Sequence, residues 1–333
     1  MVPCGETDQS QTRLILFLER TNGGDYISWK SLYQVGTCYK NQHESREILQ
    51  KIQLERLKYI VNYAYRESPL YREKFKKKGV DPSDIRTLDD IAKIPLVTKG
   101  EIKNAFPQGV IPHHFTKDNC IVKTTSGSSG NVLTVFCDRK AADYLTAVAF
   151  RDHLAQGVRP WHTFCIILNN PEELKKSGSF LYRTVNIPGQ ISPDEMVSQA
   201  RIHQPHIMGG HPSTLVAMAH VVERTGITDL TPEKILLGGE VAHPPYREYI
   251  EKIFQCETLN RYGACETHSI AWECSHHNMH INSDSVILET VESGEPVSPG
   301  EQGEIVVTNL WNRAMPFIRY RLEDIGVLSD TEC

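Results

Sequence analysis

The chain has 333 residues, of which 40% are hydrophobic and 23% are charged, and its formal net charge is −5. This length and composition predict a folded protein of about two domains and exclude a disordered chain, a collagen, a coiled coil and a disulfide mini-scaffold. The acidic balance provides no broad basic field for nucleic acid or an anionic membrane. The longest apolar run near the start, Leu14 to Leu18, is too short for an export signal or a membrane span. Because the nine cysteines also lack regular spacing, we expect reduced thiols and a cytoplasmic location.

Residues 1–45 predict a variable lead-in, since they are polar, contain Gly23-Gly24 and show little periodicity. Apolar residues between Ile48 and Ala64 then recur every three or four positions, which predicts an amphipathic helix ending near Ser68-Pro69. A shorter helix is expected from Leu70 to Gly79.

From Cys120 onward, short β-branched runs alternate with helical stretches. This alternation predicts an α/β fold in which flanking helices connect the strands of a sheet. The expected strands cover 132–137, 164–168, 206–208 and 234–237, and the expected helices cover 141–156, 193–203, 213–224 and 245–254.

The pattern changes after Trp272, where three expected strands (285–291, 304–310 and 325–328) follow one another with Gly/Pro turns and no helix between them. The sequence therefore predicts an α/β core over residues 46–270 and a β-rich subdomain over residues 271–333.

A Ser/Thr/Gly loop, Thr124-Thr125-Ser126-Gly127-Ser128-Ser129-Gly130, lies between two expected strands. Its glycines permit a tight turn, and its hydroxyl and N–H groups are suited to an anion. It is not a Walker A loop, because no Gly-Lys-Ser/Thr follows. Taken alone, a Ser/Gly surface turn has the same composition.

Three further motifs follow in order. Gly238-Gly239-Glu240 ends an expected strand, where α/β sheets place their ligands. The segment Arg261-Tyr262-Gly263-Ala264-Cys265-Glu266 provides an aromatic face, a glycine for close approach and a carboxylate. Arg319-Tyr320-Arg321-Leu322-Glu323-Asp324 adds charges in a strand–loop setting. Each alone is also typical of a surface salt-bridge cluster, but their order and spacing together favour one functional site.

In this order, the motifs resemble the core motifs of acyl-adenylate-forming enzymes. The resemblance covers about residues 46 to 333, and the segment before the loop narrows it to the phenylacetate–CoA ligase branch. The segments that carry this narrower resemblance are Arg56-Leu57, Ser68-Pro69-Leu70-Tyr71-Arg72, Gly79-Val80-Asp81-Pro82, Leu88-Asp89-Asp90-Ile91 and Ile94-Pro95-Leu96-Val97-Thr98-Lys99.

The resemblance implies the large N-terminal domain of such enzymes and a two-step reaction. ATP and a carboxylic acid, by family default an aryl acid such as phenylacetate, give an acyl-AMP and pyrophosphate, and coenzyme A then displaces AMP. Both adenylation reactants are anions, so positioning and charge neutralisation carry most of the rate. Two alternatives stay open, namely an adenylating enzyme with a non-CoA acceptor and a catalytically silent nucleotide-binding module. A zinc-dependent hydrolase ranks last, because no His-Glu-x-x-His motif is present.

The resemblance also implies residue roles. Thr125, Ser126, Ser128 and Ser129, with Gly127 and Gly130, would hold the phosphates. Gly239 and Glu240 would pass along the adenine, Tyr262 would stack on it, and Asp324 would take the ribose hydroxyls. Glu266, the predicted catalytic residue, would help to hold Mg²⁺, and Arg261, Gly263 and Cys265 belong to the same cofactor-binding segment.

We expect the acid pocket to involve Tyr144, Phe150, Gly210 and His211, although apolar helix residues are more often plain core. The sequence departs from the family pattern at Asn131, where Lys-Pro is common, and at Cys265, where Thr is usual. These departures favour the silent module, whereas the intact Glu266 and Asp324 favour an enzyme.

Cys274, His276, His277 and His280 fall within seven positions, a pattern that exposed histidines beside a stray thiol also explain. The resemblance implies a structural Zn²⁺ held by Cys274, His280 and Cys333, with a fourth ligand two residues beyond Cys333 or from His276 or His277. Thiolates and imidazole suit tetrahedral zinc.

Family members continue for roughly a hundred residues more, with a mobile C-terminal domain that carries a catalytic lysine. We therefore expect this chain to be a fragment or truncated isoform that lacks the mobile domain. The resemblance further implies a small-molecule acid as the partner and a homodimer, with no nucleic acid or membrane.

Overall fold

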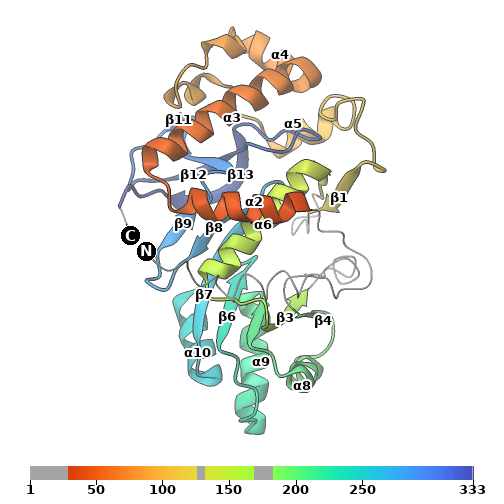
Figure 1. Ribbon diagram of the computed structural model, residues 1–333, viewed down its shortest axis with the longest axis vertical. Helices are drawn as coiled ribbons and strands as arrows, with labels where there is room; N and C mark the ends of the chain where they lie inside the picture. The colour runs from red at the N-terminus through yellow and green to blue at the C-terminus, as the bar shows by residue number, and fades with distance from the viewer. Residues whose placement is uncertain (1–28, 126–131, 169–182, 332) are drawn as a thin grey trace, which may run out of the picture. The chain divides into compact units, whose positions relative to one another are not determined.

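The computed structural model describes residues 29–125, 132–168, 183–331 and 333, and Figure 1 shows their secondary structure. The described residues form two compact units. The first unit comprises His153–Arg261, and the second comprises Trp29–Asp152 together with Tyr262–Cys333. This division differs from the predicted boundary near residue 270, because the early helices bury their apolar faces in the same core as Ile270, Val307 and Phe317.

The first unit is built on a parallel sheet of strand order β4-β3-β5-β6-β7. Its helices α8, α9 and α10 lie beside the strands, with α9 between the other two (Figure 1). This arrangement confirms the predicted alternation of strands and helices. The elements are β3 (Thr163–Leu168), β4 (Arg183–Pro188), α8 (Pro193–His203), β5 (Ile207–Gly210), α9 (Pro212–Thr225), β6 (Lys234–Gly238), α10 (Pro244–Phe254) and β7 (Glu257–Ala264), whose last residues pass into the second unit.

Local signals fix the helix ends of the first unit. Ser192 caps α8, and a capping box joins it to Glu195 through hydrogen bonds in both directions. Helix α9 ends at Gly226, which adopts the left-handed conformation with φ of 67°. One face of each helix packs into an apolar core with residues such as Met208, Leu215 and Ile235.

The second unit contains an antiparallel sheet of order β11-β10-β12-β13 and the antiparallel pairs β1–β2 and β8–β9, which confirms its predicted β-rich part. A register irregularity interrupts the β12–β13 pairing between Glu304 and Val306. The strands are β1 (Cys120–Thr124) paired with β2 (Thr134–Asp138), β8 (His268–Glu273) paired with β9 (Met279–Ile281), and β10 (Val286–Glu292), β11 (Glu295–Pro296), β12 (Gln302–Asn309) and β13 (Tyr320–Val327).

The helices of the second unit confirm the two predicted after residue 45. They are α2 (Trp29–Gln42), α3 (Arg46–Glu67), α4 (Pro69–Lys78), α5 (Lys99–Ala105) and α6 (Arg139–Ala155), with the short 3₁₀ turns η1 (Pro82–Asp84) and η2 (Asp89–Lys93). Ser45 caps α3, and Gly79, with φ of 71°, ends α4. Within the described ranges, no helix has both the length and the apolar character needed to cross a bilayer.

Helix α2 corrects the prediction of a variable lead-in for residues 29–42, whereas residues 1–28 of that lead-in lie outside the described residues. Cys38 on this helix is fully buried against Tyr144 and Val148 of α6. Its main-chain carbonyl accepts a hydrogen bond from Arg151 Nη1 at 3.0 Å. Asn41 Nδ2 donates to Asp284 Oδ2 at 3.0 Å. Tertiary contacts of Cys38 and Asn41 therefore stabilise this helix.

Candidate functional site

Two predicted nucleotide-binding residues meet in the second unit. The hydroxyl of Tyr262, near the end of β7, donates a hydrogen bond to Oδ2 of Asp324 on β13 at 2.7 Å. Burial of the phenol and the neighbouring Asp324 carboxylate raise the pKa of Tyr262, so its hydroxyl stays protonated. The pair combines an aromatic face with a carboxylate, which are the two groups expected for a nucleoside.

Glu266 lies in the turn between β7 and β8 and is buried, with 8% of its surface exposed. Its Oε1 accepts a hydrogen bond from the hydroxyl of Tyr320 at 3.0 Å, and its main-chain carbonyl accepts one from Asn309 Nδ2 at 3.3 Å. These contacts hold one carboxylate oxygen in place, so the side chain has a fixed orientation. A buried, oriented carboxylate is a suitable ligand for Mg²⁺.

The same segment shows why Gly263 is required. A Cβ atom at this position would lie 2.4 Å from the main-chain oxygen of His268. Glycine is therefore needed because the main chain at His268 packs closely against it. The neighbouring Cys265 is half-buried and packs against the large apolar core of the unit. Its replacement of the usual threonine is therefore accommodated by packing.

The predicted phosphate loop lies largely outside the described residues, which include Thr125 but not Ser126, Gly127, Ser128, Ser129 or Gly130. Thr125 closes the β1–β2 hairpin: its N–H donates to the carbonyl of Leu133, and its Oγ1 accepts from Leu133 N–H, both at 2.9 Å. The loop thus begins at a defined hairpin base.

Lys123 and His268 form a contact that the sequence analysis did not predict. Lys123 Nζ lies 3.1 Å from His268 Nε2 and donates to it, on the strand that leads into the loop. Burial and the positive charge of Lys123 lower the pKa of His268 to about 3, so the ring is neutral and accepts the hydrogen bond. The signal in the sequence was a lysine directly before the Ser/Thr/Gly run.

In the first unit, the structure brings together two residues that were assigned to different ligands. Glu240 Oε1 lies 3.1 Å from His211 Nδ1, and its Oε2 accepts from Ser213 N–H at the start of α9 at 3.1 Å. Burial raises the pKa of Glu240, but the hydrogen bonds from Ser213 and His211 outweigh it and hold the pKa below its usual range. Gly239, with φ of 78°, has no room for a Cβ, which would lie 2.8 Å from His211 Nε2.

Gly210 and Arg261, which were predicted to bind ligands, both contact other residues of the first unit. Gly210 ends β5, where a Cβ atom would lie 3.3 Å from Cβ of Ile167. Arg261 Nη1 donates to Nε2 of His153, a partner that the sequence analysis missed. Burial and the charge of Arg261 hold the pKa of His153 well below its usual range.

The residues expected to line the acid pocket on α6 are buried. Tyr144 stacks on Trp311 with ring centroids 3.5 Å apart, and its hydroxyl donates to Asp284 Oδ2 at 2.9 Å. Phe150 is 7% exposed. The structure thus gives Tyr144 a packing role, and its assignment to the acid pocket stays a prediction.

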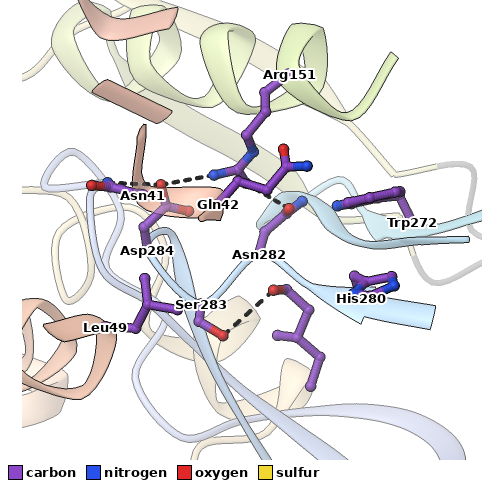
Figure 2. Close-up of a pocket in the computed structure, with 10 residues that line it drawn as sticks. Asn41, Gln42, Leu49, Arg151, Trp272, His280, Asn282, Ser283 and Asp284 are labelled. Atoms are coloured by element: carbon purple, nitrogen blue, oxygen red, sulfur yellow. Dashed lines mark hydrogen bonds and ion pairs between the residues drawn. The ribbon is translucent and has the colours of Figure 1, made fainter. Parts of the chain in front are cut away.

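A cavity of about 160 Å³ lies in the second unit, beside the buried Arg151 (Figure 2). Arg151 Nη1 donates to Asp284 Oδ2 at 2.9 Å, and its Nη2 donates to Asn282 Oδ1 at 2.6 Å. Figure 2 shows Trp272 and His280 side by side, and their rings stack at 4.9 Å. The cavity is lined by Asn41, Gln42, Leu49, Arg151, Trp272, His280, Ile281, Asn282, Ser283 and Asp284.

The three predicted zinc ligands lie together in the second unit. The ligand atoms of Cys274, His280 and Cys333 are within 4.8 Å of one another, and the two Sγ atoms are 3.7 Å apart. Nε2 of His280 is buried without a hydrogen-bond partner among the described residues, as expected for a nitrogen that binds a metal. The donor set therefore fits Zn²⁺. His277 does not join it, because its Nδ1 lies 3.0 Å from Glu273 Oε1.

Sequence comparisons extend over most of the chain. It is 27% identical over 308 residues to a phenylacetate-coenzyme A ligase of Thermus thermophilus, covering 86% of this chain and 67% of the relative. It is 29% identical over 297 residues to the phenylacetate-coenzyme A ligase of Aromatoleum evansii, covering 84% and 67%. Over most of its length the chain is therefore similar to phenylacetate-coenzyme A ligases. No protein-family model matches it.

Solved structures of CoA ligases share the fold of this chain. A 2-hydroxyisobutyryl-CoA ligase in complex with 2-HIB-AMP and CoA superposes with a TM-score of 0.76 at 19% identity, covering 85% of this chain and 66% of that protein. The structure of VinN matches with a TM-score of 0.50 over 69% of this chain and 64% of VinN. The chain thus shares the α/β fold of these CoA ligases and spans about two thirds of the length of the proteins that it matches.

Proposed function

We propose that the chain contains the adenylation site of an AMP-forming acid–CoA ligase. The observation that carries this proposal is the meeting of Tyr262 and Asp324 in the same unit as the oriented carboxylate of Glu266. The relatives' names add the reaction, since they are CoA ligases that act on phenylacetate or 2-hydroxyisobutyrate.

In the proposed first step, a carboxylate oxygen of the acid attacks the α-phosphorus of ATP. The bond from this phosphorus to the pyrophosphate oxygen breaks, and pyrophosphate leaves. In the second step, the thiolate of coenzyme A attacks the acyl carbon and releases AMP. All bonds that form or break belong to ATP, the acid and coenzyme A. The protein therefore contributes positioning of these substrates and stabilisation of their charge.

The nucleoside would be held by the Tyr262–Asp324 pair. Asp324 Oδ2 accepts from Tyr262, which leaves lone pairs on both carboxylate oxygens for the ribose hydroxyls. The ring of Tyr262 would stack on the adenine. Gly239 and Glu240 stay predicted adenine neighbours, and His211 and Gly210 stay predicted neighbours of the acid.

Glu266 would contribute one ligand to Mg²⁺ bound with the phosphates. Its Oε1 is held by Tyr320, so Oε2 is the oxygen available to the ion. Neutralising phosphate charge in this way favours attack by an anionic carboxylate. The Ser/Thr/Gly loop, of which Thr125 is described, would bind the phosphate oxygens.

A structural zinc ion would be held by Cys274, His280 and Cys333. The gathered donor atoms and the unpartnered His280 Nε2 support this proposal. Such an ion would fasten β9 and the hairpin turn before it to the last residue of the chain. It takes no part in the reaction.

The proposed acid is an aryl acid such as phenylacetate, in line with the named relatives. A non-CoA acceptor is the close alternative for the second step. The predicted cytoplasmic location and homodimer are separate proposals that the adenylation chemistry does not require.

Acid-dependent exchange of pyrophosphate into ATP tests the proposal, with phenylacetate heading a panel of carboxylic acids. Calorimetric titration with Mg·ATP runs beside it. The assay uses the chain joined to a C-terminal domain that carries the catalytic lysine of the family, and exchange with one class of acids, lost in Glu266→Gln, is the expected result. ATP binding without exchange for any acid would instead favour the silent nucleotide-binding module, and absence of ATP binding would overturn the nucleotide site.

A further inference from the structure

A second group of metal-binding side chains lies in the second unit, apart from the cysteine cluster. Glu67 is the last residue of α3, and His113 and His114 are adjacent in the loop between α5 and β1. One carboxylate oxygen and one nitrogen from each ring lie within 4.8 Å of one another. Neither the sequence motifs nor the proposed reaction uses these three residues.

The ring of His114 has a fixed orientation. Its Nε2 forms a hydrogen bond with the hydroxyl of Tyr63 at 3.1 Å, and Tyr63 is 8% exposed. Tyr63 precedes Glu67 by one helical turn on α3, so both side chains lie on the same face of the helix. With Nε2 engaged, a metal at this site would bind Nδ1, the other nitrogen of the His114 ring. Histidine ligands commonly have this second hydrogen bond, which orients the ring.

The main chain of the loop is also held in place. Nδ2 of Asn119 donates to the carbonyl of His114 at 2.8 Å, and the N–H of Thr116 donates to Oδ1 of Asn119 at 2.8 Å. The rings of His114 and Phe115 pack with centroids 4.5 Å apart. The two histidines are therefore on a defined turn, although their outer surfaces are exposed.

Two arginines of the same unit have other partners. Arg72 Nε donates to the carbonyl of Tyr65 at 3.1 Å, and its Nη2 donates to the carbonyl of Arg66. Arg313 Nη2 pairs with Asp138 Oδ1 at 3.1 Å. Within the part of the chain that the structure describes, no hydrogen bond or ion pair engages the Glu67 carboxylate, so it is available to a cation.

We propose that Glu67, His113 and His114 form a surface site for a divalent transition-metal ion such as Zn²⁺ or Ni²⁺. Two imidazoles and one carboxylate are a suitable donor set for these ions, and water would complete the coordination. The ligand atoms lie within 4.8 Å of one another, and bonds of about 2.0–2.1 Å to one ion would bring them together around it. The exposed ring of His113 would adjust to the ion, while His114 stays hydrogen-bonded to Tyr63.

The test is a calorimetric titration of the chelator-treated chain with Ni²⁺. The substitutions Cys274→Ser and Cys333→Ser are present in every variant, so that the cysteine cluster does not contribute. We expect one Ni²⁺ per chain, lost in His114→Ala and weakened at least tenfold in His113→Ala and Glu67→Gln. His43→Ala, which removes another exposed histidine of the same unit, is the matched control and should leave the affinity unchanged.

Tyr63→Phe separates the metal site from general histidine binding. This variant keeps the buried aromatic ring of α3 but removes the hydroxyl that orients His114. We therefore expect weaker Ni²⁺ binding, and an unchanged thermal unfolding temperature when no metal is present. Equal affinity for Ni²⁺ in the parent, Glu67→Gln and His43→Ala proteins would overturn the site. A parent protein that binds no Ni²⁺ would also overturn it. The result does not depend on adenylation, because no step of the test uses ATP or an acid.

Discussion

The hydroxyl of Tyr262 donates to Oδ2 of Asp324 at 2.7 Å, although 62 residues separate them in the sequence. The contact joins the end of β7 to β13, and both residues belong to the same compact unit. It brings an aromatic face to a carboxylate whose remaining lone pairs can accept hydrogen bonds. Two separate sequence motifs thus become one surface with the chemistry of a nucleoside site.

Asp324→Ala should weaken ATP binding more than Tyr262→Phe does. Each hydrogen bond from a ribose hydroxyl to the charged carboxylate contributes about 1.5–3 kcal/mol, which corresponds to roughly a 10- to 100-fold loss of affinity. Tyr262→Phe keeps the ring and removes only the bond to Asp324, so we expect less than about a tenfold loss. Calorimetric ATP titrations measure both, and equal losses would contradict the assignment of the ribose to Asp324.

Glu266→Gln should abolish measurable Mg·ATP-dependent pyrophosphate exchange while the chain stays folded. The amide keeps the size of the side chain but removes the negative charge that binds the ion, and metal stabilisation of phosphate charge contributes several kcal/mol. At about 1.4 kcal/mol for each factor of ten, this corresponds to a rate loss of about 100-fold or more.

Tyr320→Phe is the matched control for Glu266→Gln. It removes the hydrogen bond to Glu266 Oε1 and leaves the carboxylate charged. We expect a smaller loss of exchange that higher Mg²⁺ partly restores. If Glu266→Gln showed the exchange rate of the parent chain, the metal would be bound elsewhere.

The sequence predicted the α/β unit and the helices α3, α4, α6, α8, α9 and α10 because hydrophobic periodicity is a local property. The ordered motifs also predicted one site for Tyr262, Glu266 and Asp324, and the structure places Tyr262 against Asp324. It did not predict the pairing of Arg261 with His153, because only the tertiary fold brings a helix residue and a strand residue together. Helix α2 was missed for a similar reason, since its stability depends on contacts with Arg151 and Asp284.

Removing Cys274 should lower the thermal stability of the metal-loaded chain but not that of the chelator-treated chain. A structural Zn²⁺ stabilises the folded state because the unfolded chain does not present its ligands together. Cys274→Ser leaves His280 and Cys333 in place and removes one thiolate. We expect the chelator-treated parent and the variant to unfold at the same temperature, with only the parent stabilised by added Zn²⁺. Equal response to Zn²⁺ would exclude Cys274 as a ligand.

His153 should make the stability of the chain fall as the pH decreases below about 6.5. Burial and the charge of Arg261 hold its pKa well below 6.5 in the folded chain, so the ring stays neutral there. In the unfolded chain the ring takes up a proton below that pH. Because the unfolded state then binds one more proton, the free energy of unfolding rises with pH by up to about 1.4 kcal/mol per unit across this window and levels off above it.

His153→Gln should remove this contribution while its side-chain oxygen still accepts a hydrogen bond from Arg261. Urea unfolding between pH 5 and 8 compares the variant with the parent, and the variant should show the flatter dependence. His268 contributes in the same direction in both proteins, because its pKa is lowered to about 3, so it cancels in the difference. Parallel pH profiles would show that His153 does not titrate as proposed.

Arg151→Met should destabilise the second unit strongly, whereas Arg201→Met should not. Arg151 is 3% exposed and lies 2.9 Å from Asp284 Oδ2 and 3.6 Å from Asp152 Oδ1, with both carboxylates buried. Methionine fills similar space but leaves the two negative charges without their partner, and breaking a buried pair costs about 3–5 kcal/mol.

Arg201 forms an ion pair with Asp229 at the surface, where solvent replaces the lost contact. Urea unfolding of both variants therefore separates a buried arginine from an exposed one of the same chain. Because Arg151 also donates to the carbonyl of Cys38, loss of stability in Arg151→Met should be accompanied by faster proteolysis within α2. Equal stability of the two variants would show that water, rather than Arg151, satisfies the buried carboxylates through the adjoining cavity.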